Sequence, residues 1–188
     1  MEVKSGLPCV LKALSTMAQK HDDIEIIVSV ASTIRSTLVE EIVKKCQAGA
    51  VRLERDTYRV LRAADVAVTS IGTGSLEASL LGIPSVAVYR VPHSTYFFDK
   101  LADRKPNMTI TNNILRKSVI PEFIQKGFDH SKMAETVERL LYDEDARQAM
   151  LAEFSNLEYE RGEPGSVDRA ADLVVKMARC DDDGSTSG

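Results

Sequence analysis

Short apolar segments rich in β-branched residues alternate with amphipathic segments along the first half of the chain. The clearest apolar segments are IEIIVSV at 24–30, VAVTS at 66–70 and SVAVY at 85–89. Almost unbroken apolar strands are typical of parallel sheets, because helices cover both faces of such a sheet. Parallel neighbours need a crossover connection, which a helix supplies, so the alternation predicts right-handed βαβ units. The sequence therefore predicts an α/β fold built on a doubly wound parallel sheet.

Helical periodicity and weaker apolar runs complete the expected order of elements. We expect two further strands, at 50–53 and 108–111. The expected helices lie at 8–20, around 34–43, and at 57–63, 74–81, 94–103, 119–126, 131–141, 144–160 and 166–179. The pattern after residue 111 is helical, and Asp143 and Ser166 are predicted to cap the last two helices. The final segment DDDGSTSG, at 181–188, contains no apolar residue and is predicted to be disordered.

The first expected element is unusual for a doubly wound domain, which usually begins with a strand. This chain opens on a helix, with Gly6 just before it and Pro8 in its first turn. We therefore expect the first strand of the domain to be missing.

Composition excludes several classes of protein. The 188 residues are 44% hydrophobic and 28% charged, which excludes collagen-like and wholly disordered chains. A net charge of −4 offers no global attraction to nucleic acid. No stretch reaches the roughly 18 apolar residues of a membrane span, and MEVKSGLPCV lacks a signal-peptide core, so we expect a cytoplasmic protein. The three cysteines, Cys9, Cys46 and Cys180, are scattered and do not form a disulfide or zinc pattern.

The most informative segment is AADVAVTSIGTGSLEASLLGIP at 63–84. A strand is expected to end at Ser70, and a helix follows the loop that contains Gly72 and Gly74. Ligands of open α/β sheets bind beyond the carboxyl ends of the strands, where a helix start offers unpaired N–H groups and a positive dipole end. The glycines allow close approach of a phosphate, and Thr73 and Ser75 add hydroxyl donors. This turn is a candidate anion site.

Glu77 lies about one turn into the same helix, where it could accept hydrogen bonds from a ribose diol. The alternative is structural: the glycines form only a turn, Thr73 caps the helix and Glu77 is favoured near the dipole. A third glycine is absent, so the full dinucleotide fingerprint is missing and NAD or FAD is disfavoured.

Polar residues also follow the later strands. Arg90 comes directly after the strand at 85–89 and can clamp a phosphate, although a solvated loop cation is the alternative. Asn112 follows the expected strand at 108–111, with a turn-forming role as the alternative. Glu122 and Gln125 share one face of an expected helix, where capping or surface roles are the alternative.

Two remaining groups of residues carry less information. The histidines, His21, His93 and His130, have no HExxH or triad-like spacing, so metal hydrolysis and acyl transfer are poorly supported. The aromatic cluster at 96–98 is interpreted as core packing, with a surface facing a lipid or a partner domain as the alternative.

Taken in order, these motifs resemble the lipid-A-disaccharide synthase family, two-domain glycosyltransferases of the GT-B type. The central similarity is AADVAVTSIGTGSLEASLLGIPSVAVYR at 63–90. The resemblance continues through TY at 95–96, Asn112 with PEFIQ at 121–125, RGEPGS at 161–166 and RAA at 169–171. It covers about residues 2–179 and implies a Rossmann-like parallel sheet of a GT-B C-terminal domain with a helical C-terminal tail.

The resemblance implies a reaction. The family transfers an acylated glucosamine from its UDP-linked donor to an acylated glucosamine 1-phosphate, forming a β-1,6-linked disaccharide and releasing UDP. This chain would be the UDP-binding half, and neither a metal nor a cofactor is implied. The implied UDP-sugar site consists of Gly72, Thr73, Gly74, Ser75, Glu77, Arg90, Asn112, Glu122 and Gln125. The catalytic base is implied to lie in the other half, so no residue here is assigned to it.

The resemblance also implies a domain division and partners. Residues 1–142 would form the nucleotide-sugar domain, and helices at 143–180 would pack on another domain or on the second subunit of a homodimer. The lipid substrates imply peripheral contact with the inner membrane. Nucleic acid is not an expected partner.

The chain departs from the family pattern in several places. The N-terminal domain is absent, as are the first strand of the C-terminal domain and its Gly-Ser-Arg loop. Thr111 precedes Asn112 where the family has proline, and Arg116 replaces a loop glycine. Two alternatives stay open: another UDP-N-acetylglucosamine enzyme of the same architecture, such as the glycosyltransferase of peptidoglycan assembly or the 2-epimerase, and a non-catalytic nucleotide-binding or assembly domain.

Overall fold

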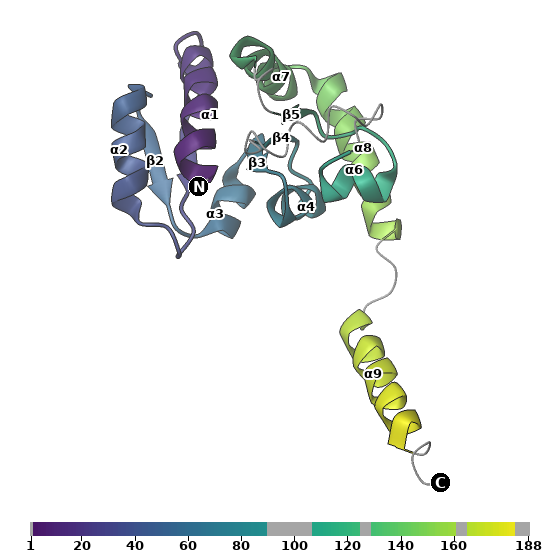
Figure 1. Cartoon of the computed structure of the whole chain (residues 1–188). Coiled ribbons are helices and arrows are strands. Elements are labelled where there is room, and N and C mark those ends of the chain that lie inside the picture. The colour runs from purple at the N-terminus through teal and green to yellow at the C-terminus, as the bar shows by residue number, and fades with distance from the viewer. Residues whose placement is uncertain (1, 90–106, 125–128, 161–164, 183–188) are drawn as a thin grey trace, which may run out of the picture.

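The computed structural model describes residues 2–89, 107–124, 129–160 and 165–182 (Figure 1). The expected helix at 94–103 and the aromatic cluster therefore lie outside the described residues. The elements in chain order are α1 (Glu2–Ala18), β1 (Ile26–Ser29), α2 (Ser36–Cys46), β2 (Val51–Glu54), α3 (Thr57–Ala63), β3 (Ala67–Ser70), α4 (Thr73–Leu80), β4 (Ser85–Tyr89), α6 (Ile110–Leu115), β5 (Glu122–Ile124), α7 (His130–Tyr142), α8 (Glu144–Glu160) and α9 (Ser166–Asp182).

All the described strand pairs are parallel, which confirms the α/β class and the parallel pairing. β1 pairs with β2, and a separate sheet has the order β3-β4-β5. The register aligns Thr69 with Ala87, and Ala87 with Glu122. The strands therefore form two separate sheets in which β1 and β3 are both edge strands.

The larger hydrophobic core lies around the three-stranded sheet. Val86 and Ala87 of β4 are fully buried, and α7 and α8 pack side chains from the same core against them. The buried contributors from the two helices are Met133, Val137, Leu140, Met150, Phe154 and Leu157. Because α8 supplies three of these residues, it packs on this part of the chain.

A smaller core joins α1 and α2 to the two-stranded sheet. Its buried members are Leu11 of α1, Ile26 of β1, Ile42 of α2 and Ala48. Helix α1 begins at Glu2, six residues before the expected start at 8, so Gly6 and Pro8 lie inside the helix. The apolar stripe of α1 extends toward the N-terminus as far as Val3, which packs against this core. Burial of this stripe stabilises the longer helix by more than the loss of the one backbone hydrogen bond that the proline cannot donate.

The two expectations for residues 108–126 are wrong. Residues 110–115 form helix α6, although we expected a strand at 108–111, and residues 122–124 form strand β5 where we expected a helix. Thr109 caps α6 by accepting a hydrogen bond from the Asn112 N–H. The Ala87 N–H donates to the Pro121 carbonyl at the start of β5. Capping and sheet pairing decide both elements, and three residues are too few to show a strand period.

The helical C-terminal tail is confirmed. The Ala146 N–H donates to Asp143 Oδ1 at 3.1 Å, as expected of a cap for α8. Ser166 is the first residue of α9, so Gly165 takes the cap position and its carbonyl accepts from the Arg169 N–H. Helix α9 stands away from the rest of the molecule in Figure 1 and ends at Asp182, two residues into the segment that we expected to be disordered.

Candidate functional site

The β3–α4 turn has the open geometry that the glycines predict. Gly72 occupies the cap position of α4 with φ of 146°, a conformation that side chains rarely adopt, and no side chain caps the helix. Among the described residues, a Cβ atom added at Gly74 would meet no atom within 4 Å apart from its chain neighbours and the backbone of its own helix. Within the described residues, the Cβ positions of Gly72 and Gly74 are therefore open, and an anion that approached there would meet the positive end of the helix.

The two hydroxyl groups of this turn have different environments. Ser75 is fully buried, and its Oγ donates to the Gly72 carbonyl at 2.8 Å. Ser79 Oγ donates to the Ser75 carbonyl and also bonds to Thr111 Oγ1 at 3.0 Å, which ties α4 to α6. Thr73 is exposed. Ser75 thus holds the turn together, while Thr73 is the hydroxyl accessible to a ligand.

Glu77 is half-buried in the middle of α4. Within the described part of the chain, its carboxylate makes no hydrogen bond or ion pair. Four residues separate it from Thr73, which corresponds to about 6 Å along the axis of an α-helix. A ligand with one anionic group at the helix start can therefore place a hydroxyl near Glu77.

Asn112 and Glu122 lie together, but their polar atoms bind the protein. Asn112 is fully buried; its Nδ2 donates to the Ile120 carbonyl at 2.8 Å and to Glu122 Oε1 at 2.9 Å. Its Oδ1 accepts from the N–H groups of Val119 and Ile120 at 2.9 and 2.8 Å. Each polar atom of this amide therefore has two partners, which is the full capacity of an amide side chain.

The Glu122 carboxylate accepts the hydrogen bonds that begin α6. Its Oε1 accepts from the Thr109 N–H at 2.8 Å and from Thr109 Oγ1 at 2.9 Å. Both carboxylate oxygens accept from the Met108 N–H at 3.0 Å. Asn112, which is buried, and Glu122, which is half-buried, therefore form one network that fixes α6 against β5. Arg90 and Gln125, the other two residues expected beside them, lie outside the described residues.

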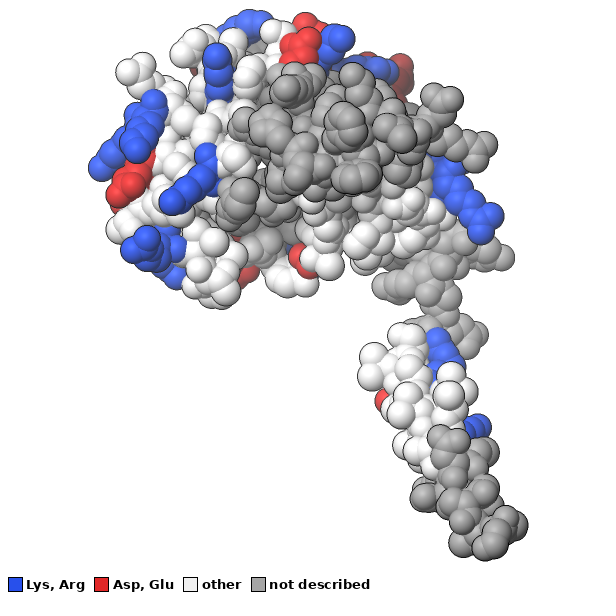
Figure 2. Space-filling view, viewed as in Figure 1, with Lys and Arg blue, Asp and Glu red and all other residues white. Residues whose placement is uncertain are grey.

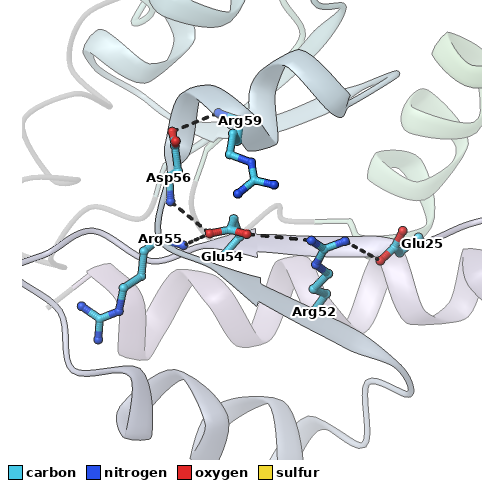
Figure 3. A network of polar contacts seen from close by, with 6 residues as sticks. All are labelled: Glu25, Arg52, Glu54, Arg55, Asp56 and Arg59. Carbon is cyan, nitrogen blue, oxygen red and sulfur yellow. Dashed lines mark hydrogen bonds and ion pairs between the residues drawn. The ribbon is translucent and has the colours of Figure 1, made fainter.

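A second polar network, at the carboxyl end of β2, was not anticipated from the sequence (Figure 3). Glu54 Oε1 accepts from the Arg55 N–H at 2.8 Å and from the Asp56 N–H at 3.4 Å. These backbone hydrogen bonds are the main reason that the pKa of Glu54 lies below its ordinary value, with smaller contributions from the charges of Arg59 and Arg52. Asp56 in turn caps α3 by accepting from the Arg59 N–H. A helix beginning at 57 immediately after an aspartate was the only sequence signal of this turn.

Positive side chains also gather near this network. On the face shown in Figure 2, Lys and Arg side chains lie over the part of the molecule that holds α2 and β2 in Figure 1. Arg52 lies 3.8 Å from Glu25 and 3.9 Å from Glu54, and Arg55 donates to Ser36 Oγ at 2.8 Å. The charges at the end of β2 are thus engaged in local contacts that hold the β2–α3 turn.

A cleft of about 1300 Å³ opens beside the β3–α4 turn. Its wall includes all of β1 and all of β3, which ends at Ser70, and Gly74 and Tyr89 line it as well.

Within the described part of the chain, no three His, Cys, Asp or Glu side chains are arranged to hold a metal ion. None of the described helices is both long and apolar enough to cross a membrane.

A profile of the lipid-A-disaccharide synthetase family matches residues 1–175, nearly the whole chain. The chain belongs to this family. The lipid-A-disaccharide synthase of Syntrophus aciditrophicus is 30% identical over 182 residues, covering 96% of this chain and 48% of that protein. The synthase of Anaeromyxobacter dehalogenans strain 2CP-C is 31% identical over 179 residues, covering 95% and 47%. The chain therefore spans about half the length of these curated relatives.

Proposed function

We propose that this chain is the donor-binding half of a lipid-A-disaccharide synthase-type glycosyltransferase, and that its ligand is UDP-2,3-diacylglucosamine. The observation that carries the proposal is the β3–α4 turn. Gly72 has φ of 146°, and no described residue fills the space beside the Cβ position of Gly74. A diphosphate fits such a helix start because backbone N–H groups and the helix dipole both favour negative charge there.

The proposal gives the residues of α4 distinct roles. The Thr73 hydroxyl and the N–H groups of the first turn donate to the diphosphate, and Glu77 accepts from the ribose hydroxyls. Ser75 positions the turn through its bond to the Gly72 carbonyl. By the family pattern, Arg90 and Gln125 complete the donor side, while Asn112 and Glu122 act by fixing α6.

The chemistry that the proposal assigns to this half is stabilisation of the leaving group. A hydroxyl of the acceptor, an acylated glucosamine 1-phosphate, attacks the anomeric carbon as the bond from that carbon to the diphosphate oxygen breaks. Negative charge then develops on UDP, next to the start of α4, where preorganised N–H groups stabilise it. The proposed general base belongs to the half of the enzyme that this chain does not span. The acylated donor implies a peripheral position at a membrane surface.

Calorimetric titration of the full chain with UDP tests the proposal. We expect saturable binding that weakens at least about tenfold in Glu77→Gln, because a lost hydrogen bond to a charged group is worth about 1.5–3 kcal/mol. The Glu135→Gln variant, at an exposed position of α7, is the matched control and should bind like the parent chain.

The ribose of UDP provides a second test of the role of Glu77. If Glu77 binds the ribose, a 2′,3′-dideoxy analogue of UDP should bind the parent chain and Glu77→Gln equally well. Absence of binding at about 10 mM UDP by a chain that circular dichroism shows to be folded would refute the donor site. Equal loss for UDP and its dideoxy analogue would refute the role of Glu77 alone.

A further inference from the structure

The buried face of helix α4 consists of small side chains. The helix has eight residues, and its buried residues are Ser75, Ala78 and Ser79. Larger side chains fix a helix against its neighbours by packing as ridges into grooves, which serine and alanine do only weakly. A helix of about two turns is also too short to be stable by itself. Hydrogen bonds to other elements are therefore important for the position of α4.

A series of side-chain hydrogen bonds connects α6 to the start of α4. Ser79 Oγ donates to the Ser75 carbonyl at 2.8 Å. A serine hydroxyl has one hydrogen, so in the 3.0 Å hydrogen bond between Ser79 Oγ and Thr111 Oγ1 the donor is Thr111. Ser75 Oγ in turn donates to the Gly72 carbonyl at 2.8 Å. The series therefore begins at the Thr111 hydroxyl and reaches the cap residue of α4.

Burial strengthens these hydrogen bonds. Thr111 and Ser75 are fully buried, and Ser79 is 2% exposed. Water is excluded from such a site, and hydrogen bonds in series polarise one another when the surroundings have a low dielectric constant. Loss of the Thr111 hydroxyl should therefore also weaken the bond from Ser79 to the Ser75 carbonyl.

The helix that carries Thr111 is itself fixed to the sheet. The N–H and the hydroxyl of Thr109, the cap residue of α6, donate to Glu122 Oε1 of β5 at 2.8 and 2.9 Å. Asn112, the neighbour of Thr111, donates to the same oxygen at 2.9 Å. The Thr111 hydroxyl therefore extends from a helix start that β5 holds in place, and through it α6 can fix α4 relative to the sheet.

We propose that Thr111 is a positioning residue for the donor site, because its hydroxyl holds α4 and the turn at Gly72 in place through Ser79. The inference rests on the proposed function, in which the start of α4 binds the diphosphate of UDP. Thr111 acts through Ser79 and does not touch the donor. Without its hydroxyl, the first N–H groups of α4 are less well oriented, and they stabilise an anion less.

Two substitutions at Thr111 separate the hydroxyl from the shape of the side chain. Thr111→Val keeps the shape and removes the hydroxyl, whereas Thr111→Ser keeps the hydroxyl and removes the methyl group. In calorimetric titrations of the full chain with UDP, Thr111→Val should bind about fivefold more weakly than the parent, and Thr111→Ser within about twofold of it. Equal binding by Thr111→Val and the parent, or the reverse order that a packing role predicts, would overturn the proposal.

Ser85→Ala is the matched control for the loss of a buried hydroxyl. Ser85, in β4, is fully buried, and its Oγ has no hydrogen-bond partner among the described residues. The variant should bind UDP like the parent chain. A loss as large as that of Thr111→Val would show a general effect of removing buried hydroxyls, and would overturn the assigned role.

A double variant tests the route through Ser79. Ser79→Ala removes the acceptor of the Thr111 hydroxyl and should itself weaken UDP binding. If Thr111 acts only through Ser79, the addition of Thr111→Val to Ser79→Ala should cause no further loss of affinity. A second loss as large as that of Thr111→Val alone would overturn the route.

Amide hydrogen exchange without nucleotide tests the position of α4 independently of UDP. In Thr111→Val, exchange at Glu77 and Ala78 of α4 should accelerate about fivefold, while Val86 of β4 and all three amides in Thr111→Ser should exchange as in the parent. Unchanged exchange at Glu77 and Ala78 in Thr111→Val would overturn the hold on α4, whether or not UDP binds. Absence of UDP binding by the parent chain would instead refute the proposed donor site, and with it the functional role of this hold.

Discussion

The region around the three-stranded sheet and the region around the two-stranded sheet differ in how completely their strands are enclosed. β4 has a partner on each edge, and its Val86 and Ala87 are fully buried. β1 has one partner among the described strands, and its burial decreases from Ile26, which is buried, to Ser29, which is exposed. The apolar composition of the two strands is similar. A strand becomes part of the core when other strands pair with both of its edges. Burial therefore depends on its place in the sheet as well as on its own sequence.

The polar networks beside the two sheets also differ in how deeply they are buried. Around the three-stranded sheet, Asn112 and Glu122 form a network in which Asn112 is fully buried. Around the two-stranded sheet, Glu54 and Asp56 form an exposed network that holds a turn. Burial makes the first network expensive to disrupt, and water weakens the second.

The largest effect is expected from Asn112→Ala. This substitution leaves the N–H groups of Val119 and Ile120 without the acceptor that they now have. Each buried unpaired N–H costs about 1–3 kcal/mol, so the free energy of unfolding should fall by about 2–5 kcal/mol in urea titrations followed by circular dichroism. Asn113→Ala, at the adjacent and more exposed position, is the control and should lower it by about 1 kcal/mol or less. Equal losses in the two variants would contradict the importance of the buried network.

An intermediate effect is expected from Arg116 and Gln47, the two non-glycine residues with positive φ in the part of the chain that the structure describes. Arg116 ends α6 with φ of 52°, and Gln47 ends α2 with φ of 49°. Arg116→Gly and Gln47→Gly should each raise the free energy of unfolding by about 0.5–1 kcal/mol, because glycine avoids the left-handed strain but loses more entropy on folding.

The matched control for these variants is Glu135→Gly, in the exposed middle of α7, which should lower stability by about 1 kcal/mol. Thermal unfolding of the four proteins checks the order. A loss of stability in Arg116→Gly would show that the arginine side chain contributes more than its backbone conformation costs.

The smallest effect is expected from the exposed acids. The pKa of Glu54 lies below its ordinary value because of backbone N–H groups, and that of Glu153 lies below its own because of Lys117. A lowered folded-state pKa adds stability that is present above the ordinary value of 4.5 and is lost as the pH falls through the folded-state pKa. Glu54→Gln and Glu153→Gln should each flatten this acid-induced loss slightly.

Salt distinguishes the two acids. The Glu153 pair with Lys117 is a direct charge interaction at 2.8 Å, so added salt should weaken its contribution. The contribution of Glu54 depends mainly on the neighbouring N–H groups and should respond less to salt. Urea titrations of the two variants from pH 3 to 7, at low and at high salt, measure these contributions. An equal response of Glu54→Gln and Glu153→Gln to salt would contradict the different causes given for their lowered pKa values.

Local patterns allowed the order and type of the elements up to residue 89 to be predicted, although α1 begins six residues before its expected start. The helix at 57–63 has the expected bounds, and the strand at 85–89 does as well. Helical periodicity predicted the first and a β-branched apolar run predicted the second, and the structure adds the Asp56 cap at the start of the helix. The errors at 108–126 arose because a threonine cap and pairing with β4 outweigh short-range preference there.

The sequence by itself determined the α/β alternation and the glycine turn after β3, because side-chain periodicity and the freedom of glycine act within a few residues. Only the tertiary structure decided that Glu122 of β5 binds Asn112 and the cap residue Thr109 of α6, because these residues belong to separate elements. It also decided that the strands form two sheets around an open groove. Strand pairing is a long-range choice, made by whichever backbone edges the packed helices bring together.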